Sequence, residues 1–168
     1  MSSDNDENFH DLQTFTGSAL FNRTFSEGMA LVEETARYLD GRGRDESRAL
    51  PRKAAILYAG ESMRVTTRLM QAASWLLVQR AVHEGDMRAE DAARDRYRLG
   101  SKEICLGGGA EGVEMLPATL QNLLVRSDTL YRRIARLDEV LFGRSQRGGD
   151  DVRGHLDRLE EAFGQAGA

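Results

Sequence analysis

The amino-acid sequence predicts an all-α protein, an antiparallel three-helix bundle with flexible N- and C-terminal tails. Its 168 residues include 39 Leu and Ala but only 11 Val and Ile, a bias that favours helices over strands. Apolar residues recur at helical spacing in three long stretches, and 14 of the 17 glycines lie between these stretches or after the last one. Because glycine interrupts regular structure, the glycines divide the chain into three main helices.

We expect one domain with a tail at each end. Residues 1–16 are polar and acidic and are predicted to form a flexible N-terminus. Residues 17–142 are predicted to form the three-helix bundle. Residues 143–168 begin with GRSQRGGDD, a composition typical of a flexible linker, and are predicted to be a flexible tail that contains a short amphipathic helix.

The ends of the helices follow from local residue types. The first helix has apolar positions three or four residues apart from Phe21 to Leu39, which place one apolar stripe on a helix, and Gly41 marks its end. The second helix is predicted from about Pro51 to His83. The third begins near Pro117, since proline is tolerated best in the first turn of a helix.

The third helix shows the most regular repeat. Two sets of positions recur every seven residues: Leu116, Leu123, Leu130 and Leu137, and Leu120, Ser127, Ile134 and Leu141. A repeat of seven forms the seam that helices need when they pack at a shallow crossing angle. We therefore expect this helix to face the rest of the bundle along its whole length.

The segment between the second and third helices is predicted to lie outside the core. Residues 88–98, RAEDAARDRYR, carry charge on most sides, which predicts a short solvated helix with a Glu90–Arg94 pair at i,i+4. The glycines 107–109 follow Lys102, whereas a phosphate-binding loop has its glycines before the lysine. This order favours a flexible connection over a phosphate site.

The tail contains an apolar pattern of its own. Val152, Leu156, Leu159 and Phe163 are four, three and four residues apart, as in a short amphipathic helix. Two interpretations remain open: this helix packs back on the bundle, or it is a docking element for the groove of a partner.

The second helix is apolar on too many sides for a single contact. With about 100° per residue, Met63, Met70 and Leu77 share one face, while Val65, Leu69 and Leu76 belong to another. A helix at a protein surface buries a stripe of roughly 100°, and these faces together are wider. Met63, Met70 and Leu77 are therefore predicted to lie either in the core of the chain or in the seam of a homodimer.

The remaining sector of this helix is polar and contains the single tryptophan. It is either a solvated face or a partner-binding surface, and we favour the second because Trp and Arg dominate binding energy at many interfaces. The predicted partner-binding residues are Glu61, Arg64, Arg68, Gln71, Trp75 and Gln79.

The sequence offers little for catalysis or for a metal. Metal sites in helical bundles use a Glu-x-x-His pattern that faces inward, and the one histidine of residues 17–142, His83, is preceded at three residues by Arg80. A single cysteine excludes a disulfide framework and a zinc site built on several cysteines. We therefore expect no enzymatic activity, no metal and no cofactor.

DNA binding is a weaker alternative. Arg126, Arg132, Arg133 and Arg136 lie close together on the third helix, and such residues could neutralise phosphates. Asp128, Asp138 and Glu139 dilute this charge, and the net charge of the chain is −4, whereas nucleic-acid domains are usually basic.

The expected location is the cytoplasm. The uninterrupted apolar runs, such as Trp75 to Val78, are all far shorter than the roughly 20 residues that span a bilayer. The first ten residues, MSSDNDENFH, lack the basic and apolar segments of an export signal.

Residues 58–87, YAGESMRVTTRLMQAASWLLVQRAVHEGDM, resemble the central helix of the RcdA family, the regulators of CtrA degradation in α-proteobacteria. The preceding residues 31–52 are similar as well, and the resemblance covers about residues 15–142. The segments YAGESMR, TTRLMQ and ASWLL make it specific. Neither end of the chain matches the family.

The resemblance implies a homodimeric three-helix bundle without catalysis that acts as an adaptor for the ClpXP protease. Its implied partners are a priming response regulator, the protease and cargo proteins such as the cell-cycle regulator CtrA, with a cyclic di-GMP effector protein as a further partner. Recruitment to a cell pole would follow from these partners. Such an adaptor raises the effective concentration of cargo at the protease. The alternative is a helical DNA- or protein-binding regulator unrelated to proteolysis.

Overall fold

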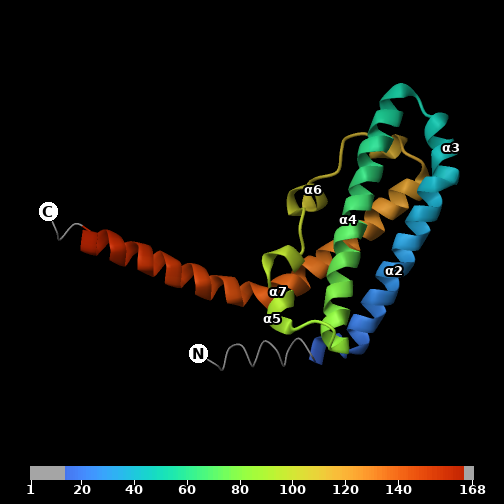
Figure 1. The fold of residues 1–168 in the computed structure, drawn as a ribbon. Helices are drawn as coiled ribbons and strands as arrows, with labels where there is room; N and C mark the ends of the chain where they lie inside the picture. The colour runs from blue at the N-terminus through green and yellow to red at the C-terminus, as the bar shows by residue number, and fades with distance from the viewer. Residues whose placement is uncertain (1–13, 165–168) are drawn as a thin grey trace.

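The computed structural model describes the backbone of residues 14–164 and the side chains of residues 14–143. Over this part of the chain all regular structure is helical, which confirms the all-α class. Three long helices dominate Figure 1: α2 (Ala19–Asp40), α4 (Arg52–Glu84) and α7 (Ala118–Gly164). The short elements between them are α3 (Arg42–Arg48), α5 (Ala89–Ala92), α6 (Lys102–Leu106) and the 3-10 helices η1 (Asp95–Tyr97) and η2 (Val113–Met115).

The helix ends are set by local residue types. Ser18 caps α2 by accepting a hydrogen bond from the backbone N–H of Phe21 at 3.2 Å, which satisfies one of the otherwise unpaired first N–H groups. Gly85 ends α4 with a φ of 82°, a left-handed conformation that glycine adopts without a steric penalty. Pro51 directly precedes α4, and Pro117 directly precedes α7.

Helix α4 packs against both α2 and α7, and α2 also contacts α7. The prediction of antiparallel packing is correct for α2, because Glu34 pairs with Arg126 while Glu27 pairs with Arg133. It is wrong for α4 and α7, which run in the same direction. Arg68 contacts residue 124 and, seven residues further along α4, Trp75 contacts residue 138.

The parallel arrangement has its cause in the connection between the two helices. Residues 85–117 run back along α4, so that α7 starts near the end at which α4 starts (Figure 1). Parallel neighbours need such a long return, whereas antiparallel helices are joined by short loops. We call α2, α4 and residues 118–143 of α7 the helical body.

The connection 85–117 contributes residues to the core, although most charged side chains of residues 88–98 are exposed as the sequence predicts. Ala92, Leu99 and Cys105 are buried among the core residues of the long helices. The predicted Glu90–Arg94 pair is replaced by other pairs, since Arg94 lies 2.8 Å from Asp91 and Glu90 pairs with Arg88.

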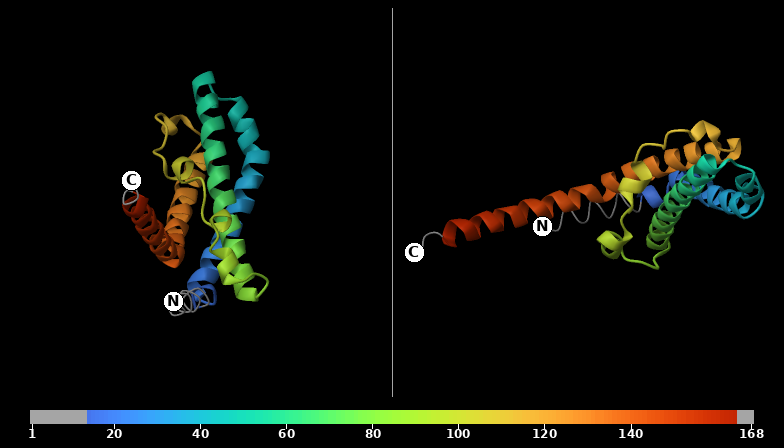
Figure 2. Two further views of the ribbon diagram at one scale, coloured as in Figure 1. Left: turned by 60° about the vertical axis from the view of Figure 1, so that its left-hand side comes forward. Right: turned by 90° about the horizontal axis from the view of Figure 1, so that it is seen from above.

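The two ends of the chain also differ from the expected boundaries. Residues 1–13 of the predicted N-terminal tail lie outside the described residues, but residues 14–16 form a helical turn in which Thr16 is buried. At the other end α7 continues through residues 143–151 to Gly164 and extends beyond the body (Figure 2). This segment is helical where its glycines predict a linker, and the Arg, Gln and Leu residues around those glycines favour a helix.

Candidate functional site

The polar sector of α4 faces the interior of the chain. The residues Glu61, Arg68, Trp75 and Gln79 are buried, each at most 5% exposed, so the prediction of an exposed partner-binding face is wrong for these four residues. Arg64 and Gln71, the other two residues of the sector, are half-buried. The sector is buried because the connection 85–117 and α7 cover it.

A buried carboxylate explains the position of the tryptophan. Trp75 donates a hydrogen bond from Nε1 to Oδ1 of Asp138 at 2.9 Å. Arg98, from the connection, donates to both oxygens of Asp138 at 2.8 Å, and Asp138 itself is fully buried. These three side chains, the Asp138 cluster, join α4, α7 and the connection. Removing one partner of such a buried ion pair strongly destabilises the folded protein, because the other partner is left buried without an opposite charge.

The other polar residues of α4 hold the connection by its backbone. Arg68 donates to the carbonyl oxygen of Cys105 at 2.9 Å and lies 3.0 Å from Asp128. Arg64 donates to the carbonyl oxygen of Gly108 at 2.7 Å. Gln71 accepts from the backbone N–H of Gly100 at 3.1 Å. The polar sector thus fixes the fold of residues 98–108.

Burial has electrostatic consequences in this sector. It lowers the pKa of the Arg68 guanidinium, an effect that the nearby carboxylate of Asp128 opposes. Tyr131 donates to the carbonyl oxygen of Gly100 at 2.6 Å, and burial raises the pKa of its phenol above the ordinary value. The amide of Gln79 has no hydrogen-bonding partner among the described residues, and nothing in the structure explains this.

An apolar stripe of α4 lies on the opposite side, away from α7. Ile56, Met63, Met70 and Leu77 are 66%, 71%, 67% and 53% exposed. They are spaced by seven residues and therefore share one helical face. Met63, Met70 and Leu77 are not in the core of the chain, so of the two predicted roles only the dimer seam remains. We call these four residues the α4 stripe.

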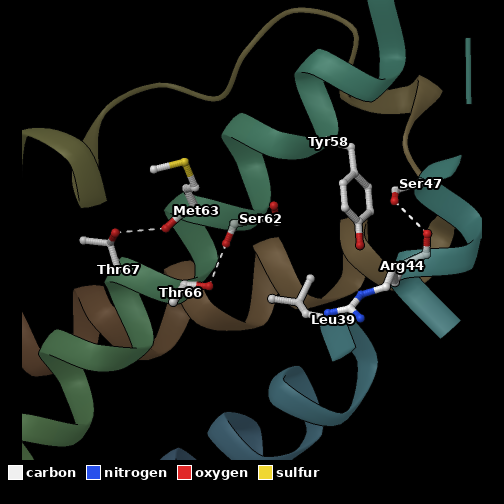
Figure 3. A pocket seen from close by; sticks show the side chains of 8 residues that line it. All are labelled: Leu39, Arg44, Ser47, Tyr58, Ser62, Met63, Thr66 and Thr67. Atoms are coloured by element: carbon white, nitrogen blue, oxygen red, sulfur yellow. Dashed lines mark hydrogen bonds between the residues drawn. The ribbon is translucent and has the colours of Figure 1, made fainter. Parts of the chain in front are cut away.

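Two hollows border the α4 stripe. One, of about 510 Å³, lies between α2 and α4 and is lined mainly by apolar side chains, among them Val32, Leu39, Met70 and Leu77. The other, of about 380 Å³, is shown in Figure 3 and is lined by Leu39, Arg44, Ser47, Tyr58, Ser62, Met63, Thr66 and Thr67. Its threonine hydroxyls are occupied locally, since Thr66 donates to the carbonyl of Ser62 and Thr67 to that of Met63, both at 2.9 Å.

Among the described residues, the groups that a metal site or a DNA contact would use are scattered or paired with one another. No cluster of three or more His, Cys, Asp or Glu residues that could hold a metal occurs among the described residues. Arg126, Arg132 and Arg133 of the predicted DNA-binding cluster are paired with Glu34, Asp128 and Glu27, all at 2.7–2.8 Å. In the part of the chain that the structure describes, none of the helices has the length and apolar character of a membrane span.

Sequence reasoning missed the residues that organise the polar sector. From the sequence, Asp128 and Asp138 only dilute a basic surface, and Arg98 belongs to a predicted solvated helix. The only local signal is that Asp138 lies within the heptad pattern of the third helix, between Leu137 and Leu141. A charged residue beside such a seam needs a buried partner, but its partners are 40 and 63 residues away in sequence.

Comparisons with known proteins agree with the resemblance. The family model described as "Protein of unknown function (DUF1465)" matches residues 12–163. The crystal structure of RcdA from Caulobacter crescentus CB15 is similar to this chain with a TM-score of 0.64 and 55% sequence identity. The similarity covers 77% of this chain and 97% of that chain. None of the curated proteins compared matches the chain.

Proposed function

Since this chain belongs to the RcdA family, we propose that it is a non-catalytic adaptor that tethers cargo to the ClpXP protease for regulated proteolysis. The cargo includes the cell-cycle regulator CtrA. The observation that supports this proposal most directly is the α4 stripe, because a contiguous exposed apolar surface is characteristic of proteins that work by binding other proteins. Tethering needs binding surfaces and no reactive side chain.

The α4 stripe is the proposed seam of a homodimer. Four large apolar side chains recur every seven residues over three heptads, and a two-fold axis would place each stripe against its copy. The residues beside the stripe are small, among them Ala59, Thr66 and Ser74, so that two backbones can approach closely. Burying each large apolar side chain contributes roughly 1.5–3 kcal/mol, which is partly offset by the cost of association.

The remaining partners are assigned to other surfaces. The priming response regulator, the protease and a cyclic di-GMP effector protein bind surfaces outside the seam, and their recruitment places the cytoplasmic adaptor at a cell pole. Arg64 and Gln71 are the residues of the predicted partner-binding set that keep some exposure. The tail residues Val152, Leu156, Leu159 and Phe163 form the proposed docking element for cargo.

A reconstituted degradation assay tests the adaptor function. ClpXP, the priming response regulator and CtrA are combined with and without this chain, and the decay of CtrA is followed. We expect faster decay only when the chain and the priming regulator are both present. Unchanged decay with a folded chain would contradict the adaptor proposal and favour a regulator unrelated to proteolysis, for which a DNA mobility shift at moderate salt is the direct assay.

A further inference from the structure

A third hollow, of about 290 Å³, lies between α4, the connection and α7. It differs from the two hollows beside the α4 stripe because three arginines line it, whereas the hollow in Figure 3 has one, Arg44, and the other has none. We call it the arginine pocket, and its walls include Arg64, Arg68, Gly108, Gly109, Val125 and Arg132. Three of its polar residues, Glu61, Arg64 and Arg68, belong to the sector of α4 that the sequence assigns to partner binding. The other three, Asp128, Thr129 and Arg132, come from α7.

The charges around the arginine pocket do not cancel. Arg68 and Arg132 share one carboxylate, that of Asp128, at distances of 3.0 and 2.8 Å. Arg64 is paired with the carboxylate of Glu61 at 3.5 Å. Three guanidinium groups therefore face two carboxylates, which leaves one positive charge for a ligand to neutralise.

Arg132 is the residue that can offer this charge to a ligand. Its side chain is 50% exposed, whereas those of Arg64 and Arg68 are 21% and 6% exposed. It donates to Asp128 through Nε, and its two terminal nitrogens donate no hydrogen bond to any described residue. A guanidinium with free terminal nitrogens can bind a carboxylate through two parallel hydrogen bonds.

The other walls of the pocket suit a short peptide end. A Cβ atom added to Gly108 or Gly109 would meet no atom within 4 Å, so this side is open to the backbone of a ligand. Val113, Leu124 and Val125 supply apolar surface for a small side chain. The volume lies at the lower end of the roughly 300–1,000 Å³ that is typical of ligand pockets, which favours one or two residues over a nucleotide.

We propose that the arginine pocket binds the C-terminal carboxylate of a polypeptide. The single negative charge of a carboxylate neutralises the excess positive charge, whereas a phosphate group with nearly two charges would reverse it. The last backbone N–H of a peptide lies close to its carboxylate and can donate to the oxygen of Asp128 that faces Arg132. This inference stands apart from the tethering of cargo to a protease, since it concerns a ligand that the chain binds by itself.

Fluorescence anisotropy with a labelled hexapeptide that ends in two alanines tests the inference on the full chain. The same peptide with a C-terminal amide lacks the negative charge and should bind at least about tenfold more weakly, as expected when charge-assisted hydrogen bonds are lost. Arg132→Gln should weaken binding of the acid peptide to the level of the amide. Arg136→Gln, an equal change of charge at an exposed position of α7 that does not line the pocket, should leave binding unchanged.

Three results would overturn the inference. The first is equal binding of the amide and acid peptides. The second is an equal loss of binding in Arg132→Gln and Arg136→Gln. The third is displacement of the peptide by inorganic phosphate at lower concentrations than by acetate. The third result would make the pocket a phosphate site. No protease takes part in this measurement, so its outcome is separate from that of the degradation assay.

Discussion

At the scale of single residues, the positions of Trp75 and Asp138 depend on each other. A tryptophan can be buried fully only if its indole N–H finds an acceptor, and Asp138 supplies one. The same carboxylate neutralises Arg98, whose side chain is 10% exposed. The burial of Glu61, Arg68 and Trp75 is therefore explained by their partners within the chain.

The Asp138 cluster gives a prediction for stability. Asp138→Asn keeps the size of the side chain but removes the negative charge, so that Arg98 stays buried without a counter-charge. We expect a loss of about 3–5 kcal/mol in the free energy of unfolding, measured by urea unfolding followed by circular dichroism. Glu139→Gln, at the next and exposed position, should change this free energy by less than about 0.5 kcal/mol. Equal unfolding midpoints for both variants would contradict this account.

The buried tyrosines give a prediction for alkaline pH. Burial raises the pKa of Tyr131 and of Tyr38, which donates to Glu46 at 2.7 Å. The folded state therefore retains phenol protons that the unfolded chain loses near pH 10. This contribution to stability is fully present below about pH 10 and is lost as the pH rises further.

We expect tyrosinate absorbance and the loss of helical signal to rise together above pH 10. Tyr131→Phe removes one of the titrating groups, so the stability of this variant should fall less steeply with pH in that range. If all the tyrosines ionise near pH 10 while the helical signal stays unchanged, the folded state does not retain the phenol protons and this account is wrong.

At the scale of elements, the sequence predicts helix ends better than helix faces. Gly41, Pro51 and Pro117 act on their own neighbours, and each of the long helices begins or ends beside one of them. The direction of α7 relative to α4 depends instead on how the connection 85–117 packs. Its charged residues indicated exposure, but Arg98 is buried because its partner, Asp138, lies on another helix.

The faces of α4 were assigned incorrectly for a related reason. Apolar residues occur on two sides of this helix, so periodicity alone gives no single inward face. The polar character of their sector predicts that Arg68 and Trp75 lie on an exposed surface. The apolar face of Met70 predicts that it lies in the core or in a dimer seam. Tertiary hydrogen bonds from the connection and from α7 reverse the first assignment and leave Met70 exposed.

The exposure of the α4 stripe gives a prediction about assembly. Met70 is 67% exposed, so Met70→Lys places its charge in water in the monomer and should leave the fold intact. In a homodimer that buries the stripe, the same charge would be unpaired and desolvated. We expect size-exclusion chromatography with light scattering to find a monomer with a normal helical spectrum.

Val140→Lys is the matched control for this change. Val140 is 69% exposed and lies on α7, away from the stripe, so this variant should have the mass of the unmodified chain. A dimeric Met70→Lys variant would rule out the stripe as the seam, and an unfolded one would show that Met70 contributes to the core.

At the scale of the whole molecule, folding and the proposed docking are assigned to different parts of the chain. The backbone of α7 continues past Phe142 to Gly164 and leaves the body (Figure 2). A helix that leaves the body can meet a partner without competing with internal packing. This layout favours docking over back-packing for the amphipathic pattern of residues 152–163.

Truncation after Gly143 tests this separation of roles. The shortened chain keeps the Asp138 cluster, the α4 stripe and the arginine pocket, so we expect an unchanged thermal unfolding midpoint and an unchanged mass in solution. If the tail docks cargo, delivery of CtrA in the degradation assay should fall toward the rate without adaptor. The full-length chain with Ser at positions 152, 156, 159 and 163 should show the same loss, because it removes the apolar face and keeps the length. A large drop in the thermal unfolding midpoint of either variant would mean instead that the tail packs on the body. Full delivery of CtrA by both variants would show that the tail does not dock cargo.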